Sequence, residues 1–179
     1  MIRSVATFGL LASFTMCAPL WAKGDMVLVE IKGADLKAPL KITDPKIQEF
    51  NIWAGPDASN TEESEGFIIN WRAGVVQQLP AGLQHYHVSF YAGCNTRPND
   101  PECLAEKPRL VYEVSYDYDI SSQQGFVYLP YFDEPGWDAN AHAIYRGNLE
   151  GHWFQATESW ERFVRPLIAG ARNHVAGTR

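Results

Sequence analysis

Large apolar and aromatic side chains recur at every second position of residues 109–119, and this alternation constrains the fold more than any other feature of the chain. The large side chains are those of Leu110, Tyr112, Val114, Tyr116 and Tyr118. Successive side chains of a β-strand point to opposite faces of its sheet. A period of two therefore predicts a strand that turns one face toward the core.

A second segment with the same period, residues 83–91, precedes this strand. Its register assigns Tyr86, Val88 and Phe90 to the core. Only a turn-rich loop separates the two segments, and neighbouring strands joined by such a loop pair antiparallel. We therefore expect residues 83–119 to form a hairpin.

Two cysteines, Cys94 and Cys103, flank the loop between these segments, which is rich in Pro, Asn and Asp. In an oxidising compartment an even pair this close is typical of a local disulfide. Two free thiols are the alternative. Closing so short a loop stabilises the folded chain by roughly 2–3 kcal/mol. A Cys94–Cys103 bond is thus expected to tie the tip of the hairpin without creating the fold.

Other short apolar segments bounded by turn residues predict further strands. They are residues 26–31, 36–42, 66–72 and 125–130, with 141–145 and 153–154 supplying one or two final strands. Pro39 suits an edge strand, where a missing N–H costs little. About six or seven strands favour a mainly β single domain, built as a β-sandwich or an open barrel.

Two helices are expected to flank the strands. Asp44 suits an N-cap and Pro45 the first helical position, which predicts a short N-terminal helix. After Thr157, a second candidate N-cap, apolar side chains recur with a helical period. They are Trp160, Phe163, Val164, Leu167 and Ile168. This pattern predicts a C-terminal amphipathic helix docked on the strands.

The first 22 residues have the parts of a secretory signal. A basic residue near the start, a largely apolar run over 5–20 and the small residue Ala22 are typical of such a segment. Leu20 replaces the usual small residue before the cut, so an uncleaved anchor is the alternative. We expect a signal peptide at residues 1–22 and one mainly β domain at 23–179.

Charge limits the partners of this chain. It has 15 Lys and Arg against 21 Asp and Glu, a formal net charge of −6, and removal of the signal deletes Arg3 and no acid. Nucleic acids and anionic membranes need basic patches. We therefore exclude nucleic acid and, after cleavage, stable membrane insertion. We expect a secreted or periplasmic protein whose partner is a small molecule, a glycan or an envelope protein.

His85 and His87 are the first candidates for chemistry. Two imidazoles on one strand face can reach the same Zn or Cu ion, and His142 or His152 can supply a third ligand. The alternative is that both are solvent-facing strand residues and that no cofactor is bound. Metal binding, with or without catalysis, is therefore one of two functional hypotheses.

Aromatic side chains, 13% of the chain, offer a second kind of site. Exposed rings of Trp and Tyr can stack on the faces of sugars. The ring set consists of Trp53, Trp71, Trp137, Trp153 and Tyr131. Since most Trp side chains are largely buried, Trp53 and Trp71 are better explained by the core. Trp137 and Tyr131, beside a break in regular structure, are the candidate ligand-binding residues.

Acidic residues give a third candidate, for Ca²⁺ or for acid–base chemistry, with ordinary solvated carboxylates as the alternative. They are Asp117, Asp119, Asp133, Glu134 and Asp138. The sequence has no Gly-x-Ser-x-Gly elbow and no phosphate-cradling glycine loop. These observations favour a non-catalytic binding or interaction module, although the question of an enzyme stays open.

Three segments, residues 32–45, 50–56 and 153–168, resemble uncharacterised secreted bacterial proteins. The resemblance implies export and brings no activity with it. Two hypotheses therefore stand: a secreted or periplasmic binding module of unknown ligand, and a metal-dependent protein that uses His85 and His87.

Overall fold

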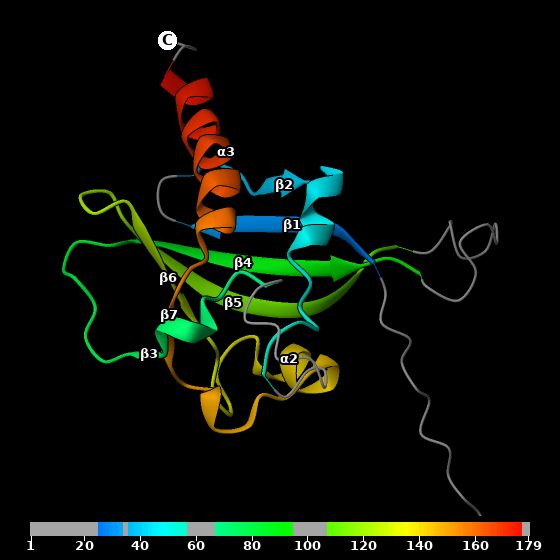
Figure 1. Ribbon diagram of the computed structural model, residues 1–179. Helices are drawn as coiled ribbons and strands as arrows, with labels where there is room; N and C mark the ends of the chain where they lie inside the picture. Colours follow the sequence, from blue (N-terminus) through cyan, green and yellow to red (C-terminus); the bar gives the residue numbers. More distant parts are fainter. Residues whose placement is uncertain (1–24, 34–35, 57–66, 95–106, 177–179) are drawn as a thin grey trace, which may run out of the picture.

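The computed structural model describes residues 25–33, 36–56, 67–94 and 107–176. Within them, seven strands form one antiparallel sheet in the order β2-β1-β4-β5-β6-β7-β3 (Figure 1). The strands are β1 (Met26–Gly33), β2 (Leu40–Ile42), β3 (Val75–Val76), β4 (Gln84–Ala92), β5 (Arg109–Asp119), β6 (Gln124–Tyr128) and β7 (Trp153–Gln155). The mainly β class is confirmed, whereas neither a sandwich nor an open barrel is.

The hairpin of β4 and β5 forms the centre of the sheet. Tyr86 lies opposite Tyr116, Val88 opposite Val114 and Phe90 opposite Tyr112. All six side chains are buried. The predicted hairpin and its core face are therefore confirmed.

α3 (Glu158–Ala176) packs on that core face of the hairpin. Trp160, Val164 and Ile168 are buried at the spacing of one helical face, and the rings of Trp160 and Phe90 lie 6.2 Å apart. The Trp160 N–H donates to Thr157 Oγ1 at 3.3 Å. The predicted C-terminal helix and its cap are confirmed.

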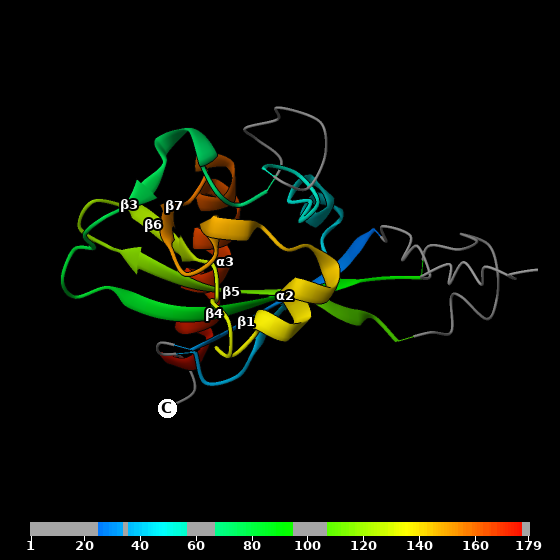
Figure 2. The same ribbon diagram turned by 90° about the horizontal axis from the view of Figure 1, so that it is seen from below.

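α2 (Trp137–Ala143) lies on the other side of the hairpin from α3 (Figure 2). β6 pairs with β5 only from Ser115 to Asp119, so the first half of β5 has no strand on that side. There the carboxamide of buried Asn140 takes the place of a neighbouring strand. The Glu113 N–H donates to Asn140 Oδ1 at 2.6 Å, and Asn140 Nδ2 donates to the Glu113 carbonyl at 2.7 Å. This pair of bonds replaces one step of a β-ladder.

Two predicted strands are wrong. Residues 141–145 lie mostly in α2. The hydrogen bonds of Asn140 to β5 outweigh the weak preference of this short segment for a strand. Of the predicted segment 66–72, the described residues 67–72 hold only an isolated bridge between Ile69 and Ala156, followed by the 3₁₀ helix η2 (Trp71–Ala73). The three side chains at 67–69 are all buried. A continuous apolar run therefore fills the core there as an irregular segment.

The predicted N-terminal helix is the 3₁₀ helix η1 (Pro45–Glu49). Asp44 Oδ1 accepts a hydrogen bond from the Lys46 N–H at 2.9 Å, and Ile47 is buried. Of the predicted edge strand 36–42, only Leu40–Ile42 forms a strand, β2, which begins after Pro39 and lies at one edge of the sheet as expected. A third 3₁₀ helix, η3 (Gly147–Leu149), leads into β7. In the part of the chain described, no helix has both the length and the apolar character that a membrane crossing requires.

Two predictions fall on other parts of the chain. The predicted signal peptide, residues 1–22, and Cys103 lie outside the described residues. Cys94, two residues after the end of β4, is disulfide-bonded. The signal peptide and the pairing of Cys94 with Cys103 therefore stay predictions.

Candidate functional site

His85 and His87 lie on the face of β4 that points away from α3, because they alternate with the buried core residues. Each contacts a carboxylate of β5. His85 Nδ1 is 2.8 Å from Asp117 Oδ2, and His87 Nε2 is 2.8 Å from Glu113 Oε1. Ser89 Oγ donates to the same Glu113 oxygen at 2.9 Å. We call these five residues the histidine face.

In the first of these pairs the carboxylate is the buried partner. The side chain of Asp117 is 3% exposed and that of His85 is 77% exposed. Burial raises the pKa of Asp117, and the hydrogen bond with His85 opposes the rise. A carboxylate bound to Nδ1 orients the imidazole ring.

The other two histidines lie on different elements. His142 belongs to α2, with Nδ1 2.6 Å from the Asp138 carbonyl oxygen, and exposed His152 precedes β7. Among the residues that the structure describes, no group of three or more His, Cys, Asp or Glu side chains could hold a metal ion. Of the expected Zn or Cu ligands, only His85 and His87 share a strand face. Metal binding therefore stays a prediction.

A pocket of about 320 Å³ lies between α2, the start of β5 and Trp53. We call it the α2 pocket. Ala139 and Ala143 lie one turn apart on the helix, and their small side chains leave space between α2 and its neighbours. The other lining residues are Trp53, Arg109, Leu110, Val111, Asp138 and His142. The pocket thus combines an aromatic and aliphatic wall with three polar side chains.

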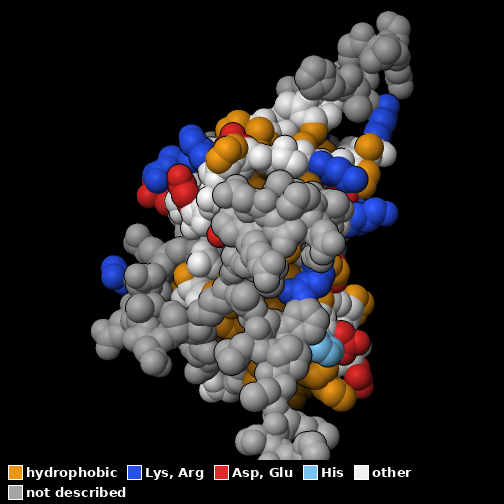
Figure 3. Space-filling view, turned by 90° about the vertical axis from the view of Figure 1, so that its right-hand side faces the viewer, with side chains coloured by type: hydrophobic (Ala, Val, Ile, Leu, Met, Phe, Trp, Pro, Cys, Tyr) orange, Lys and Arg blue, Asp and Glu red, His pale blue; other side chains and the backbone are white. Residues whose placement is uncertain are grey.

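The surface on this flank of the molecule has two zones. On the side shown in Figure 3, hydrophobic side chains lie beside acidic and histidine side chains in the lower part. Lys and Arg side chains lie mainly in the upper part. The lower zone of this side therefore combines hydrophobic, acidic and histidine side chains.

The predicted ligand-binding residues do not line this pocket: Trp137 is the first residue of α2, and Tyr131 precedes that helix. Trp137 is half-buried, and its ring packs edge-on against Phe132 with centroids 4.9 Å apart. Tyr131 and Phe132 are each 57% exposed. Trp53, which the sequence analysis assigned to the core, is half-buried and forms a wall of the pocket.

Four of the five acids singled out from the sequence have local contacts or line the α2 pocket. Asp119 accepts hydrogen bonds from Ser121 and Ser122 in the turn after β5, and these bonds lower its pKa to about 2. Glu134 accepts from the Tyr131 N–H at 2.8 Å. Asp117 pairs with a histidine, and Asp138 lines the α2 pocket. Asp117, Asp119 and Glu134 therefore each have a hydrogen-bonding partner within the described residues.

Sequence reasoning missed Arg146, which is fully buried. Its guanidinium donates to three backbone oxygens of the segment that carries Trp53, and its Nε donates to Tyr112 Oη at 3.2 Å. The three oxygens belong to Ile52, Ala54 and Pro56, at 2.5, 3.1 and 2.8 Å. One side chain thereby attaches the pocket wall to β5. A single Arg in an irregular segment gives no sequence pattern that could have revealed this.

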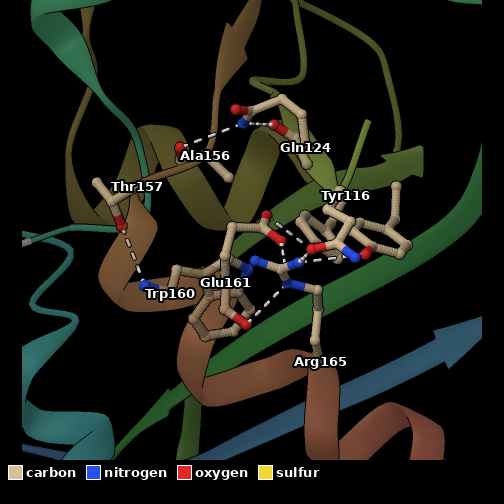
Figure 4. Close-up of polar contacts among 10 residues, drawn as sticks. Tyr116, Gln124, Ala156, Thr157, Trp160, Glu161 and Arg165 are labelled. Carbon is tan, nitrogen blue, oxygen red and sulfur yellow. Dashed lines mark hydrogen bonds and ion pairs between the residues drawn. The ribbon is translucent and has the colours of Figure 1, made fainter. Parts of the chain in front are cut away.

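Sequence reasoning also missed a buried cluster between α3 and the sheet (Figure 4). Tyr116 Oη donates to Glu161 Oε1 at 2.9 Å, and Arg165 Nε lies 3.0 Å from Glu161 Oε2. Burial raises the pKa of Glu161 to about 7, against the opposing effects of Tyr116 and Arg165. A side chain at Gly125 would collide with this carboxyl group. Glu161, in the first turn of α3, is thus a buried titratable group.

Together these features define a single antiparallel sheet with an amphipathic helix on one face and a short helix beside β5 on the other side. No family model, curated protein or solved structure matches the chain. The functional argument therefore depends on the geometry of the sites.

Proposed function

We propose that the protein is a non-catalytic binding module, secreted or periplasmic, that holds a small, largely apolar molecule in the α2 pocket. The observation that carries this proposal is the pocket itself, with a volume of about 320 Å³. Small-molecule sites span roughly 300–1,000 Å³ and are mostly apolar with a few polar groups. The α2 pocket has both properties.

The lining indicates the chemistry of the ligand. Trp53, Leu110 and Val111 provide an aromatic and aliphatic surface, which suits a flat ring. Arg109, Asp138 and His142 add one cation, one anion and an imidazole. We therefore expect an aromatic or alicyclic molecule with a polar or ionised substituent.

The walls of the pocket are held in place before any ligand arrives. Arg146 binds the backbone of residues 52–56, and Asn140 binds α2 to β5. A site that is already formed loses little conformational entropy when it binds. This supports binding without a large rearrangement.

Fluorescence titration with 1-anilinonaphthalene-8-sulfonate, an aromatic anion, tests the proposal. Ala143→Phe fills the pocket and is expected to weaken dye binding at least about tenfold, or about 1.4 kcal/mol. Ala81→Phe adds the same ring at an exposed position before β4 and is expected to leave binding unchanged. Thermal unfolding checks that both variants are folded. Equal dye affinity in wild type and Ala143→Phe contradicts the proposal.

The metal-binding alternative rests on the common face of His85 and His87. Elemental analysis of protein purified without chelator tests it. Stoichiometric Zn or Cu that is lost in His85→Ala supports this alternative. No bound transition metal, or metal retained by that variant, eliminates it.

A further inference from the structure

Two aromatic rings lie side by side where β6 and β7 pair. Tyr128 and Trp153 are opposite each other in this ladder, and their ring centroids are 5.1 Å apart with an interplanar angle of 38°. They alternate with Val127 and Phe154, which are buried in the core, so the two rings lie on the sheet face that points away from the core. Both are half-buried. Part of each ring is therefore open to solvent.

A third ring, that of Tyr131, lies at the same end of the two strands. Its side chain is 57% exposed and packs over Gly151, two residues before Trp153. A Cβ atom at Gly151 would lie only 3.2 Å from Tyr131 Cδ2, and the φ of Gly151, 79°, also favours glycine. The absence of a side chain at this position lets the tyrosine ring lie close to the strand that carries Trp153.

One carboxylate joins the two tyrosines. Glu134 Oε1 accepts a hydrogen bond from Tyr128 Oη at 3.2 Å, and Glu134 Oε2 accepts from the Tyr131 N–H at 2.8 Å. Burial, with the hydrogen bond and the charge of Glu134, raises the pKa of Tyr128 to about 12, so the phenol keeps its proton. We call Tyr128, Tyr131, Glu134 and Trp153 the aromatic corner.

The charge of Glu134 is not balanced by a neighbouring cation. Its two hydrogen-bond donors are neutral, and over the described ranges it forms no ion pair with Lys, Arg or His. An ionised carboxyl group has about four lone-pair sites. Each oxygen of Glu134 can therefore face a positive charge while it keeps its present hydrogen bond.

The chain around the corner is strongly acidic. Residues 110–161 contain one Arg and no Lys, and that arginine, Arg146, is fully buried. The same stretch contains nine acids: Glu113, Asp117, Asp119, Asp133, Glu134, Asp138, Glu150, Glu158 and Glu161. Such an excess of one sign attracts ligands of the opposite charge. The charge of this region is thus complementary to a cation.

The side chains of the corner indicate which kind of cation it suits. Aromatic faces attract positive charge, and Trp does so best. A bare ammonium group is strongly hydrated, and Ca²⁺ takes six or more oxygen ligands, whereas the corner offers a single carboxylate. A quaternary ammonium group donates no hydrogen bond and presents methyl groups to the rings. It therefore needs only what the corner supplies, which is ring faces and one negative charge.

We propose that the aromatic corner binds the quaternary ammonium group of a free choline-like cation, with its methyl groups on the ring of Trp153 and its charge beside Glu134. A phosphate next to the ammonium group would be repelled by the acidic stretch, so a free cation fits better than a phosphocholine headgroup. The corner shares no residue with the lining of the α2 pocket. The protein would thus have a second binding site, separate from the one proposed above.

Titration of ¹⁵N-labelled wild-type protein with choline chloride, at constant ionic strength in NaCl, tests the proposal. Choline is expected to shift the Nε1–H signal of Trp153 and to leave that of Trp160, buried under α3, in place. An unchanged Trp153 signal overturns the proposal. The neutral compound 3,3-dimethylbutan-1-ol has the shape of choline without its charge and should bind at least about fivefold more weakly. Equal affinity would mean that the corner is only an apolar patch.

Phosphocholine in a parallel titration identifies the source of the cation. Weaker binding than that of choline supports a free cation. Binding as tight or tighter overturns that assignment and indicates a headgroup.

Two variants complete the test. Glu134→Gln should weaken choline binding about threefold, whereas Glu49→Gln should leave it unchanged. Glu49 is the matched control, because it is exposed on η1 and its loss changes the net charge equally. Trp153→Leu should weaken binding at least about fivefold, with thermal unfolding to check that it is folded. Equal losses in the two Glu variants overturn the proposal. The dye titration does not use the corner, so the two proposals fail or stand separately.

Discussion

Replacement of Glu161 by Gln tests the burial of a carboxyl group at the junction of α3 with the sheet. Glu161 is only 3% exposed, and folding removes it from water, which favours its neutral form. Its pKa rises from 4.5 to about 7. Glu161→Gln keeps the shape of the side chain and an oxygen to accept the Tyr116 hydrogen bond, but it is never ionised.

The sign and size of the effect follow from the two pKa values. Because the pKa is higher in the folded chain, the folded chain binds this proton more tightly than the unfolded chain does. The resulting stabilisation is complete below about pH 4.5 and is lost as the pH rises through about 7. A shift of about 2.5 units corresponds to about 3 kcal/mol. Ionised Glu161 therefore weakens the folded state at pH 8 by about that amount relative to a neutral side chain.

Urea unfolding of wild type and Glu161→Gln at pH 5 and pH 8 measures this directly. We expect the variant to be more stable at pH 8 by up to about 3 kcal/mol, or roughly 6–12 °C in Tm for a chain of this length. The difference should shrink markedly at pH 5. Burial also raises the pKa of Asp117 and Glu150, but both titrate in the two proteins and cancel in the comparison.

Glu158→Gln, at an exposed position of the same helix, is the matched control and should change stability by no more than about 0.5 kcal/mol. A Glu161→Gln variant that is less stable than wild type at pH 8 refutes the reasoning. It would mean that the contact with Arg165 outweighs the desolvation of the carboxylate.

Three further predictions concern other parts of the chain. Arg146→Met leaves buried backbone oxygens without a donor, so urea unfolding should show a loss of at least about 3 kcal/mol; a loss below about 1 kcal/mol contradicts the role given to this side chain. Asn140→Ala removes two hydrogen bonds to β5 and should cost about 2–3 kcal/mol, with faster hydrogen exchange in the first half of that strand as a second readout. Mass spectrometry of the exported protein should find a chain that begins directly after Ala22, with Cys94 and Cys103 protected from alkylation until reduction; free thiols or a retained leader would contradict these two expectations.

The central hairpin could be predicted from the sequence because its strands carry their own pattern. Alternation in β4 and β5 identified the buried face, and Tyr86 and Phe90 are buried as expected. α2 could not be predicted in this way, because it is short and is attached by Asn140 to a backbone site on a distant strand. β3 is shorter still, and its two residues pair only with β7. Such elements depend on contacts between distant residues, which a local hydrophobic period in the sequence does not reveal.

The candidate sites show the same limit. A period of two was enough to place His85 and His87 on one face, but their carboxylate partners depend on the register between two strands. The α2 pocket joins Trp53, the start of β5 and one face of α2, three segments far apart in the chain.

The Asn140 amide also bears on how molecules of this protein meet one another at high concentration. A strand flank with free N–H and C=O groups is a template to which a strand of another molecule can add, and such addition leads to aggregation or domain swapping. Asn140 occupies that flank at Glu113 with a group that cannot be extended into another strand. The Asn140 amide and the short helix that carries it thus occupy backbone groups of β5 that a strand of another molecule would otherwise pair with.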